Sequence, residues 1–286
     1  MELPLISVII PVLNNHKKCN QAVRSVLSQT YPNFELIVID DCSSPPISLP
    51  DDSRIKLFRN RVNEGAAHSR NRGVANAKGE YIAFLDSDDR WLDIKLERQW
   101  RHLYGKQNMH AHEERPLAIS VGTRVISKTK KRNELLIPVG SSNETDFLSG
   151  NWFFPGTALL IKESNFDELG GFDKHLRRLE DFEFFIRFCR QGGELVVLDE
   201  ELCVVNREPH ARLDHVRAAC GLIFQKHFGS IHGLNKKRVF LSYLMLETGS
   251  TAFYEKKYIE AILYLFCSIL LVPRLRVSLK DWWVIK

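Results

Sequence analysis

Two seven-residue apolar runs near the amino terminus constrain the fold of this chain more than any other feature. The runs are ISVIIPV at residues 6–12 and FELIVID at residues 34–40, and both are rich in β-branched side chains. Near-continuous apolar strands of this kind occur in parallel sheets that helices cover on both faces. The segment between them has the apolar spacing of a helix over residues 19–29. A strand–helix–strand unit with a buried sheet is therefore expected.

Strands and helices keep alternating further along the chain, which sets the fold class. Further strands are predicted at residues 54–60, 80–86, 117–127 and 157–161, and a further helix at residues 64–77. Residues 180–193, EDFEFFIRFCRQGG, have the apolar spacing of a helix that ends at two glycines. This order predicts an α/β fold, a single Rossmann-like nucleotide-binding domain with a mainly parallel central sheet.

The carboxyl-terminal part of the chain has a different character. From about residue 234 the sequence predicts a hairpin of two helices, a helical appendage docked on the main domain. Its uncharged stretch AILYLFCSILLV, residues 261–272, is shorter than the roughly 20 apolar residues needed to span a bilayer. The tail that follows mixes basic residues with Trp282 and Trp283, which suits the headgroup layer of a membrane. The alternative is a helix that packs on the protein's own surface and has a polar end.

The overall charge and the cysteines argue against several classes of protein. The chain has 40 Lys and Arg against 35 Asp and Glu, a net charge of +5 without a dominant basic block, so a nucleic-acid partner is not expected. Its six cysteines are scattered without a CxxC pair, unlike those of a zinc ribbon or a secreted disulfide-rich domain. The start, MELPLISVIIPV, lacks the basic region of a signal peptide, so the cytoplasm is the expected compartment.

Five aspartates follow two of the predicted strands at their carboxyl ends. Asp40 and Asp41 end the second strand, and Asp86, Asp88 and Asp89 lie in DSDD after the fourth. Ligands of open parallel sheets bind beyond this edge, so the five carboxylates are expected to converge around one crevice. Like charges at that density repel one another unless a cation lies between them. The cluster therefore predicts a cation site in preference to a solvated turn.

Four motifs in a fixed order carry a resemblance to a known family. They are SVIIPVLNN, SVLSQTYPNFELIVIDDCSS, NEGAAHSRNRGVANAKGEYIAFLDSDD and GGFDKHLRRLEDFEFFIRF, spread over residues 5–210. With these motifs the chain resembles a family 2 glycosyltransferase of the glycosyltransferase A fold. The resemblance implies transfer of a sugar from a nucleotide diphosphate donor to an acceptor hydroxyl, with inversion at the anomeric carbon and with Mg²⁺ or Mn²⁺. The expected domains are a catalytic domain at 1–230, divided into a nucleotide-sugar half (1–105) and an acceptor half (106–230), and the helical hairpin and tail at 231–286.

The resemblance assigns the metal ligands to the DSDD motif and to one histidine. Asp88 is expected to touch the metal directly, and Asp86 to contact the ribose or to reach the metal through a water molecule. Mg²⁺ keeps several waters and takes one or two protein carboxylates besides phosphates, so DSD needs only to tether the ion. His210 lies where some relatives supply a histidine to the metal or the diphosphate; the alternative is a surface side chain. Asp89 is expected to cap the next helix.

The resemblance also assigns the residues that hold the donor. Asp41 is expected to accept a hydrogen bond from the N3–H of uracil, while Asp40 is structural or lies near the ribose. Leu13 stands where an aromatic residue that stacks on the base is common in the family. Arg70 is expected to face the diphosphate or the donor sugar; the alternative is an exposed arginine on a helix surface. The full set of expected donor-binding residues is Pro11, Val12, Asn14, Asp41, Asn63, Gly65, Arg70, Asp86 and Ser87.

The catalytic base is expected in the sequence LEDFEFF. An acceptor hydroxyl must lose a proton as it attacks the sugar, and a positioned carboxylate can accept that proton. By resemblance the base is Asp181, and Glu180 beside it shapes the acceptor pocket. The alternative is that Asp181 is an N-terminal helix carboxylate, which the helix dipole favours. Trp152, Phe153 and Phe154 either form an aromatic platform for a sugar ring or belong to the core.

Together these features predict an inverting, metal-dependent hexosyltransferase that uses a UDP-sugar. The expected acceptor is a hydroxyl of a glycan or an undecaprenyl-linked glycan in bacterial surface polysaccharide synthesis (lipopolysaccharide or capsule), with peripheral contact at the inner face of the membrane. A sugar-1-phosphate nucleotidyltransferase is the first alternative, but it needs a glycine-rich loop with Arg and Lys after the first strand, which PVLNNHKK lacks. An inactive sugar-binding homologue is the second, although Asp86, Asp88 and Asp181 are all present. The sequence leaves the oligomeric state open.

Overall fold

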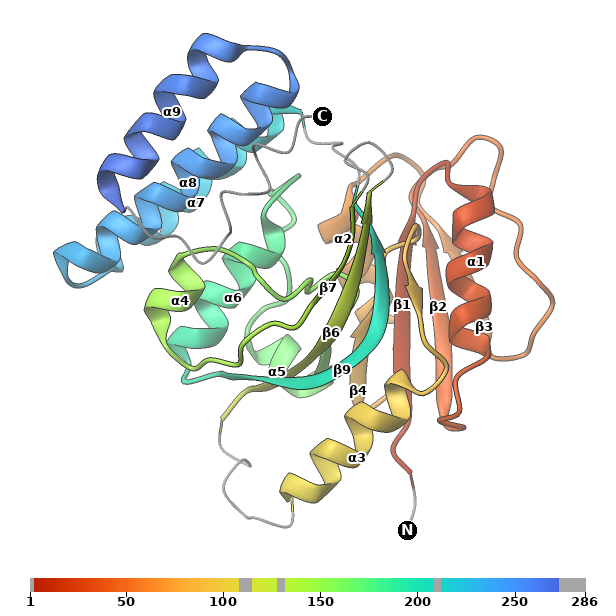
Figure 1. The fold of residues 1–286 in the computed structure, drawn as a ribbon. Coiled ribbons are helices and arrows are strands. Elements are labelled where there is room, and N and C mark those ends of the chain that lie inside the picture. Colours follow the sequence, from red (N-terminus) through yellow and green to blue (C-terminus); the bar gives the residue numbers. More distant parts are fainter. Residues whose placement is uncertain (1–2, 108–114, 128–131, 208–211, 273–286) are drawn as a thin grey trace.

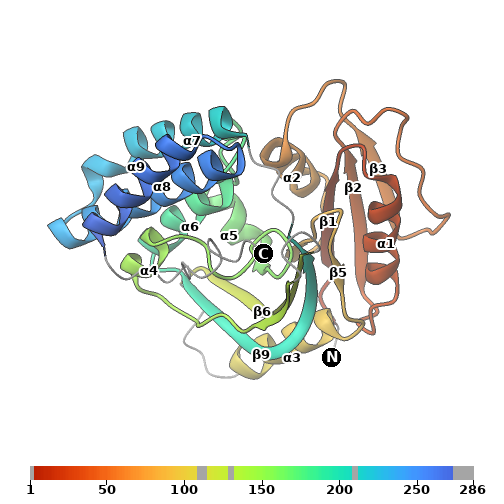
Figure 2. The ribbon, with the colours of Figure 1, turned by 45° about the horizontal axis from the view of Figure 1, so that its top comes forward.

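A curved mixed sheet forms the centre of the molecule, with helices on both of its faces (Figure 1). The structure is a computed structural model that describes residues 3–107, 115–127, 132–207 and 212–272. In a second view the helices near the carboxyl end lie together on one side of the sheet, away from its first strands (Figure 2). The predicted α/β fold with a helical unit near its carboxyl end is confirmed.

The amino-terminal half of the sheet is parallel, as predicted, and the other half is mixed. The strands are β1 (Ile6–Val12), β2 (Phe34–Asp40), β3 (Ile55–Arg59), β4 (Tyr81–Phe84), β5 (Arg90–Trp91), β6 (Leu117–Ser127), β7 (Arg132–Leu136), β8 (Leu160–Lys162) and β9 (Glu194–Asn206). Across the part of the sheet that the structure describes, the order is β3-β2-β1-β4-β8-β6-β9-β5, and β7 pairs with β6. Because β1, β2 and β4 are parallel, their carboxyl ends share the edge at which such sheets bind ligands.

Helices cover both faces of this sheet. They are α1 (His16–Leu27), α2 (Ala66–Ala75), α3 (Lys95–Gln107), α4 (Glu144–Leu148), α5 (Glu163–Glu168), α6 (Glu180–Arg190), α7 (Leu213–His227), the 3-10 helix η1 (Phe228–Ser230), α8 (Leu234–Tyr254) and α9 (Tyr258–Leu271). The predicted helices at 19–29, 64–77 and 180–193 correspond to α1, α2 and α6. The predicted hairpin beyond residue 234 corresponds to α8 and α9, which pack against each other.

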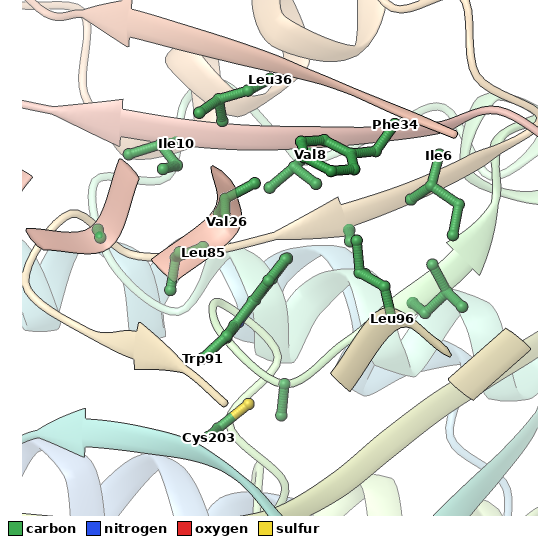
Figure 3. Packing of buried hydrophobic residues seen from close by; sticks show 14 of the residues in the cluster. Ile6, Val8, Ile10, Val26, Phe34, Leu36, Leu85, Trp91, Leu96 and Cys203 are labelled. Atoms are coloured by element: carbon green, nitrogen blue, oxygen red, sulfur yellow. The ribbon is translucent and has the colours of Figure 1, made fainter. Parts of the chain in front are cut away.

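Side chains of the buried strands alternate between two apolar layers. Ile6, Val8 and Ile10 point toward α1 and pack with Trp91 (Figure 3). Ile9 points the other way, into a second apolar cluster that contains several phenylalanines of α6. A strand whose successive side chains are both buried has to be apolar at nearly every position, which explains the continuous runs in the sequence.

Several elements differ from the expectations. β8 begins at Leu160, so the strand predicted at residues 157–161 is displaced, and residue 157 lies in a preceding turn instead. β9 was not predicted, because its middle, LDEEL, carries three acidic residues and masks the apolar pattern. A register shift between β6 and β9 at Gly122 accommodates this segment, and a Cβ at Gly122 would lie only 2.5 Å from the carbonyl oxygen of Glu200.

The helices near the carboxyl end form a layer with its own apolar core. Val216 and Ile223 of α7 pack with Phe240 and Leu244 of α8, and Phe182 of α6 joins them. In the chain as far as the structure describes it, no helix is both long and apolar enough to cross a bilayer. The helical layer is thus joined to the main domain through α6.

A buried network of charged groups holds α6 to α7. Glu183 is fully buried and accepts hydrogen bonds or ion pairs from Arg187 (2.7 Å), Lys226 (2.6 Å) and His227 (2.9 Å). Burial alone would raise the pKa of Glu183, but the hydrogen bonds from His227 and Arg187 outweigh it and bring the pKa down to about 2. The ionised carboxylate is therefore part of the stable folded state.

We expect Glu183→Gln to lower the free energy of unfolding at pH 7 by about 1–3 kcal/mol, because it removes the buried carboxylate that binds Arg187, Lys226 and His227, while solvent partly screens the exposed Lys226. The folded-state pKa of Glu183 lies below its ordinary value of 4.5, so its contribution is present above that value and is lost as the pH falls toward 2. Urea unfolding at a series of pH values measures both effects. The exposed Glu168→Gln is the matched control; equal unfolding curves for the two variants would contradict the assignment.

Candidate active site

An open pocket of about 810 Å³ lies beyond the carboxyl end of β4. Its wall includes Asp86, Asp88 and Asp89 from the turn after β4, and Glu180 and Asp181 from the start of α6. A pocket of this size is in the range of small-molecule sites, which span roughly 300–1,000 Å³. The fold therefore brings two acidic motifs that are far apart in sequence to one cavity.

Arg70 lies between the two acidic motifs and pairs with both. Its guanidinium is buried, with Nη2 2.6 Å from Asp86 Oδ1 and Nη1 2.7 Å from Glu180 Oε1. The alternative of an exposed arginine is therefore wrong. Because one buried cation binds both carboxylates, Arg70 fixes the turn after β4 in relation to the start of α6.

Asp86 and Asp88 are the partly exposed carboxylates of the turn. Their side chains are 39% and 26% exposed, and Lys18 Nζ lies 3.7 Å from Asp88 Oδ2. Gly156 keeps the space beside Asp86 open, since a Cβ there would lie 2.7 Å from Asp86 Oδ2. Two accessible carboxylates fit a hard cation such as Mg²⁺ or Mn²⁺, which takes one or two protein carboxylates and completes its shell with water and phosphate.

The predicted metal ligands are too few to enclose an ion. Within the described residues no group of three or more His, Cys, Asp and Glu side chains is arranged to hold a metal. His210, the third predicted ligand, lies outside the described residues. The arrangement of Asp86 and Asp88 agrees with a tethered ion that also needs the donor's phosphates, and it does not agree with a closed structural site.

Asp181 lies in the first turn of α6, beside Glu180. The preceding Leu179 has a φ of 60°, so the chain turns sharply before the helix begins. Burial raises the pKa of the Asp181 carboxyl to about 6, with a further rise from Glu180 that Arg70 partly opposes. A carboxylate with a pKa this close to neutrality is ionised at pH 7 and can accept a proton in catalysis. Asp181 is also an N-terminal helix carboxylate, the alternative considered for it, and this position is compatible with the role of base.

Asp89 has a structural role that differs from the prediction. It is buried, and its carboxylate accepts hydrogen bonds from Thr157 Oγ1 (2.5 Å) and from the backbone N–H of Asn206 (2.8 Å). Burial and the nearby Asp86 raise the pKa of Asp89 well above its ordinary value. Because β5 follows at once and α3 begins only at Lys95, Asp89 does not cap a helix. It joins the turn after β4 to the end of β9 instead.

The prediction that five carboxylates meet in one crevice is wrong for two of them. Asp40 and Asp41 are not in the wall of this pocket, and β1 lies between β2 and β4. Asp40 is buried and accepts hydrogen bonds from the backbone of Ser43 and Ile47. It therefore organises the loop after β2, in agreement with the structural role considered for it.

Asp41 organises the start of α2. Its carboxylate accepts hydrogen bonds from the backbone N–H groups of Glu64 and Gly65, both at 2.8 Å, and from Asn60 Nδ2 at 2.7 Å. An ionised carboxylate has about four acceptor positions, so these bonds leave one for another donor. The predicted bond to uracil stays a prediction.

The other predicted donor residues lie near the same sheet edge but are not in the wall of this pocket. Val12 is buried, Pro11 and Ser87 are partly exposed, and Leu13 is 42% exposed. Asn14 has a φ of 53°, and its side chain accepts a hydrogen bond from the backbone of Ser44.

Asn63 and Gly65 at the start of α2 contact an arginine that the sequence reasoning did not single out. Arg177 Nη1 donates to Asn63 Oδ1 at 2.9 Å, and a Cβ at Gly65 would lie 3.3 Å from the same nitrogen. Its neighbour Arg178 lines the pocket. The signal was two consecutive arginines directly before the motif LEDFEFF.

The aromatic candidates separate into two roles. Phe153 is fully buried in the core, whereas Trp152 and Phe154 line the pocket. Two further pocket residues, Tyr243 and Glu247, come from α8. Tyr243 packs against the Phe182 ring at 4.5 Å between centroids. No local pattern marks these two residues in the sequence, since only the packing of α8 on α6 brings them to the pocket.

We expect Arg70→Gln to lower the stability of the fold and to shift the pH dependence of activity. Removing the buried cation leaves Asp86 and Glu180 uncompensated, which costs about 3–5 kcal/mol in comparable buried pairs. Arg70 lowers the pKa of Asp181, so its loss moves the acid limb of activity from about pH 6 to higher pH. Chemical denaturation and a pH–rate profile measure the two effects. Arg24→Gln, at an exposed arginine of α1, is the control; an unmoved acid limb in Arg70→Gln would contradict the proposed coupling.

Comparison with known proteins identifies the family. The model of the family described as "Glycosyl transferase family 2" matches residues 7–155. An uncharacterized glycosyltransferase of Haemophilus influenzae is 34% identical over 213 residues, which cover 70% of this chain and 78% of that protein. The chain belongs to glycosyltransferase family 2. The family model ends before α6, so Glu180 and Asp181 lie outside the matched segment.

Two further comparisons extend this result. The Escherichia coli protein named UDP-Glc:alpha-D-GlcNAc-diphosphoundecaprenol beta-1,3-glucosyltransferase WfgD is 46% identical over 99 residues, 33% of this chain and 39% of that protein. The crystal structure of Staphylococcus aureus TarS 1–349 in complex with UDP-GlcNAc has a TM-score of 0.63, with 17% identity, and covers 94% of this chain and 81% of that one. At this identity the second comparison shows that the two chains share a fold.

Proposed function

We propose that this family 2 glycosyltransferase is an inverting, metal-dependent hexosyltransferase that takes its sugar from UDP. The observation that carries the proposal is the placement of Asp181, with a pKa of about 6, in the wall of the same pocket as Asp86 and Asp88. One carboxylate can serve as base, while the other two hold a cation beside the donor's diphosphate. The printed names of relatives support the donor, since one contains UDP-Glc and a structural neighbour was crystallised with UDP-GlcNAc.

In the proposed reaction each group of the pocket has one task. Asp181 accepts the proton of the acceptor hydroxyl as its oxygen attacks the anomeric carbon from the face opposite the leaving UDP. Arg70 keeps Asp86 in place and adds a positive charge near the diphosphate. Asp86 and Asp88 would hold the divalent cation, which when bound neutralises charge on the leaving diphosphate. Leu13 would cover a face of the uracil without stacking on it.

The acceptor is proposed to enter between α6 and α8. Tyr243 and Glu247 lie in the pocket wall there, and a glutamate accepts hydrogen bonds from sugar hydroxyls. The proposed acceptor is a glycan hydroxyl, either free or on an undecaprenyl-linked carrier, in the synthesis of a bacterial surface polysaccharide. The name of the Escherichia coli relative, which specifies a diphosphoundecaprenol acceptor, supports the lipid-linked form. The proposed place of action is the cytoplasmic face of the membrane.

Two alternatives make different predictions in one experiment. A sugar-1-phosphate nucleotidyltransferase would bind a nucleoside triphosphate, yet the chain enters α1 four residues after β1 without a glycine-rich loop. An inactive homologue would bind a sugar nucleotide without releasing UDP.

Thermal unfolding in Mn²⁺ with UDP-, GDP- and dTDP-sugars and with nucleoside triphosphates tests the donor. We expect UDP-sugars to raise Tm most, because UDP-sugars are the proposed donors. A ligand at 100 times its Kd stabilises the folded state by about 2.7 kcal/mol, which is enough to shift Tm measurably. A larger shift with UTP than with any UDP-sugar would favour the nucleotidyltransferase and would overturn the proposal. Stabilisation by a UDP-sugar without any UDP release would identify an inactive homologue.

A further inference from the structure

Among the residues that the structure describes, the outer face of α9 is apolar and exposed. Ile259, Ile262, Leu263, Phe266 and Leu270 are between 59% and 79% exposed, and they recur at the spacing of one helix face. On this helix only Ala261 and Ser268 are buried. Figure 1 shows α9 at the outer side of the helical layer, with α8 and α7 behind it. Apolar side chains this concentrated on one face indicate an interaction site.

The positive charge of the whole chain is concentrated in the same unit. Residues 234–286 contain nine Lys and Arg and four Asp and Glu, an excess of five. The whole chain has a net charge of +5, so residues 1–233 are neutral, with 31 basic and 31 acidic residues. Lys256 and Lys257 precede the amino end of α9, and Arg238 donates to the carbonyl oxygen of Leu271 at its other end. Basic groups thus lie at both ends of the apolar face.

We infer that the face of α9 docks on an anionic lipid surface. A helix with an apolar face and basic surroundings lies in the plane of the headgroups, with its apolar side chains inserted and its cations at the phosphates. The sequence after α9 has the same chemistry, since Arg274, Arg276 and Lys280 are followed by Trp282 and Trp283.

A second copy of the chain is a poorer occupant of this face. Pairing two α9 faces would bring together two copies of a helical unit whose described residues, 234–272, carry five Lys and Arg against three Glu, and like charges oppose such an interface. An anionic bilayer instead attracts the cations that lie close to the face of α9, by about 1 kcal/mol per Lys or Arg near its surface.

This inference deepens the proposed function, because it relates the lipid surface to the acceptor side of the pocket. α8 and α9 are held together by hydrogen bonds between Ser242 and Ser268, at 2.8 Å and 2.9 Å. α8 also contributes Tyr243 and Glu247 to the pocket wall. A lipid surface bound to α9 would therefore lie one helix away from the place where a lipid-linked acceptor is proposed to enter. Binding to vesicles itself requires neither donor nor metal.

Co-sedimentation of the full chain with vesicles tests the inference. We expect the protein to pellet with equal amounts of phosphatidylcholine and phosphatidylglycerol, and to bind phosphatidylcholine alone and high-salt samples less well. Ile262→Gln/Phe266→Gln should weaken binding by roughly tenfold to a hundredfold, since each buried apolar side chain contributes substantially to insertion. Leu57→Gln/Leu92→Gln removes two exposed apolar side chains outside the helical layer and should bind like the unaltered chain.

Two readouts keep failure of the inference separate from failure of the proposed function. Cys267 is exposed on α9, so an environment-sensitive fluorophore attached there, in a Cys42→Ser background, should shift to the blue when anionic vesicles are added. UDP release measured without lipid should be equal in the unaltered chain and in Ile262→Gln/Phe266→Gln. The inference is overturned if the α9 variant pellets like the unaltered chain, or if vesicles leave both in the supernatant. It is also overturned if sedimentation shows a dimer that the α9 variant dissociates, since a second copy then occupies the face.

Discussion

Asp181→Asn should reduce the rate of sugar transfer by about 100-fold to 10,000-fold, the usual contribution of a positioned general base. Asparagine has nearly the same shape but cannot accept the acceptor's proton. The variant should still bind UDP in Mn²⁺, because Asp86 and Asp88 are intact. Its Tm should not fall, since burial and Glu180 disfavour the ionised carboxylate that is removed.

The pH dependence gives this prediction a second test. As a base, Asp181 has to be ionised, so activity should rise with pH through about 6 in the unaltered enzyme. Residual activity of Asp181→Asn should lack that limb. Asp167→Asn, the same change at an exposed position on α5, should behave like the unaltered enzyme. A normal transfer rate in Asp181→Asn would remove the assignment of the base.

Asp88→Ala is expected to have the second largest effect, a loss of transfer on the order of 1,000-fold, because neutralising a leaving diphosphate contributes several kcal/mol. In this variant the affinity for UDP should be the same in Mn²⁺ and in chelator. In Asp181→Asn the affinity for UDP should still be higher in Mn²⁺ than in chelator. Calorimetric titration of UDP with and without Mn²⁺ measures the coupling. Asp51→Ala, at an exposed position before β3, is the control. If Asp88→Ala retains metal-dependent UDP binding, the metal is held elsewhere.

Much of the fold was predictable because burial on both faces leaves a simple pattern. The bounds of β1, β2 and β6 agree with the predicted strands, since each is a long run of apolar residues. β9 escaped prediction because its acidic middle interrupts that pattern, and it pairs with β6 only through a register shift. Periodicity detects a strand whose side chains share one environment along its length.

The candidate site was predictable where a strand end determines the position of a side chain. Asp86 and Asp88 were expected at the crevice beyond the strand ends, and they line one pocket together with Asp181, which the resemblance had assigned as the base. Asp40 and Asp41 were expected there too, but backbone N–H groups bind them, from the loop after β2 for Asp40 and from the start of α2 for Asp41. Loop hydrogen bonding of this kind is decided by conformation, which a motif does not encode.

The contribution of α8 could not be predicted from any local pattern. Tyr243 and Glu247 lie in a helix that the sequence presented as an appendage, and they reach the pocket only through packing on α6. Arg70 was predicted to face the donor, but its simultaneous contact with Asp86 and Glu180 depends on side chains from three separate elements. Contacts between distant segments are the part of a site that one sequence leaves undetermined.

The central claim, that the two acidic motifs of one pocket transfer a sugar from UDP, is tested most directly by UDP release from a UDP-hexose. We predict that the unaltered chain releases UDP in Mn²⁺, that chelator abolishes the release, and that Asp181→Asn binds UDP normally but releases it at least about 100-fold more slowly. Absence of UDP release from every UDP-hexose, or release that neither chelator nor Asp181→Asn changes, would contradict the claim.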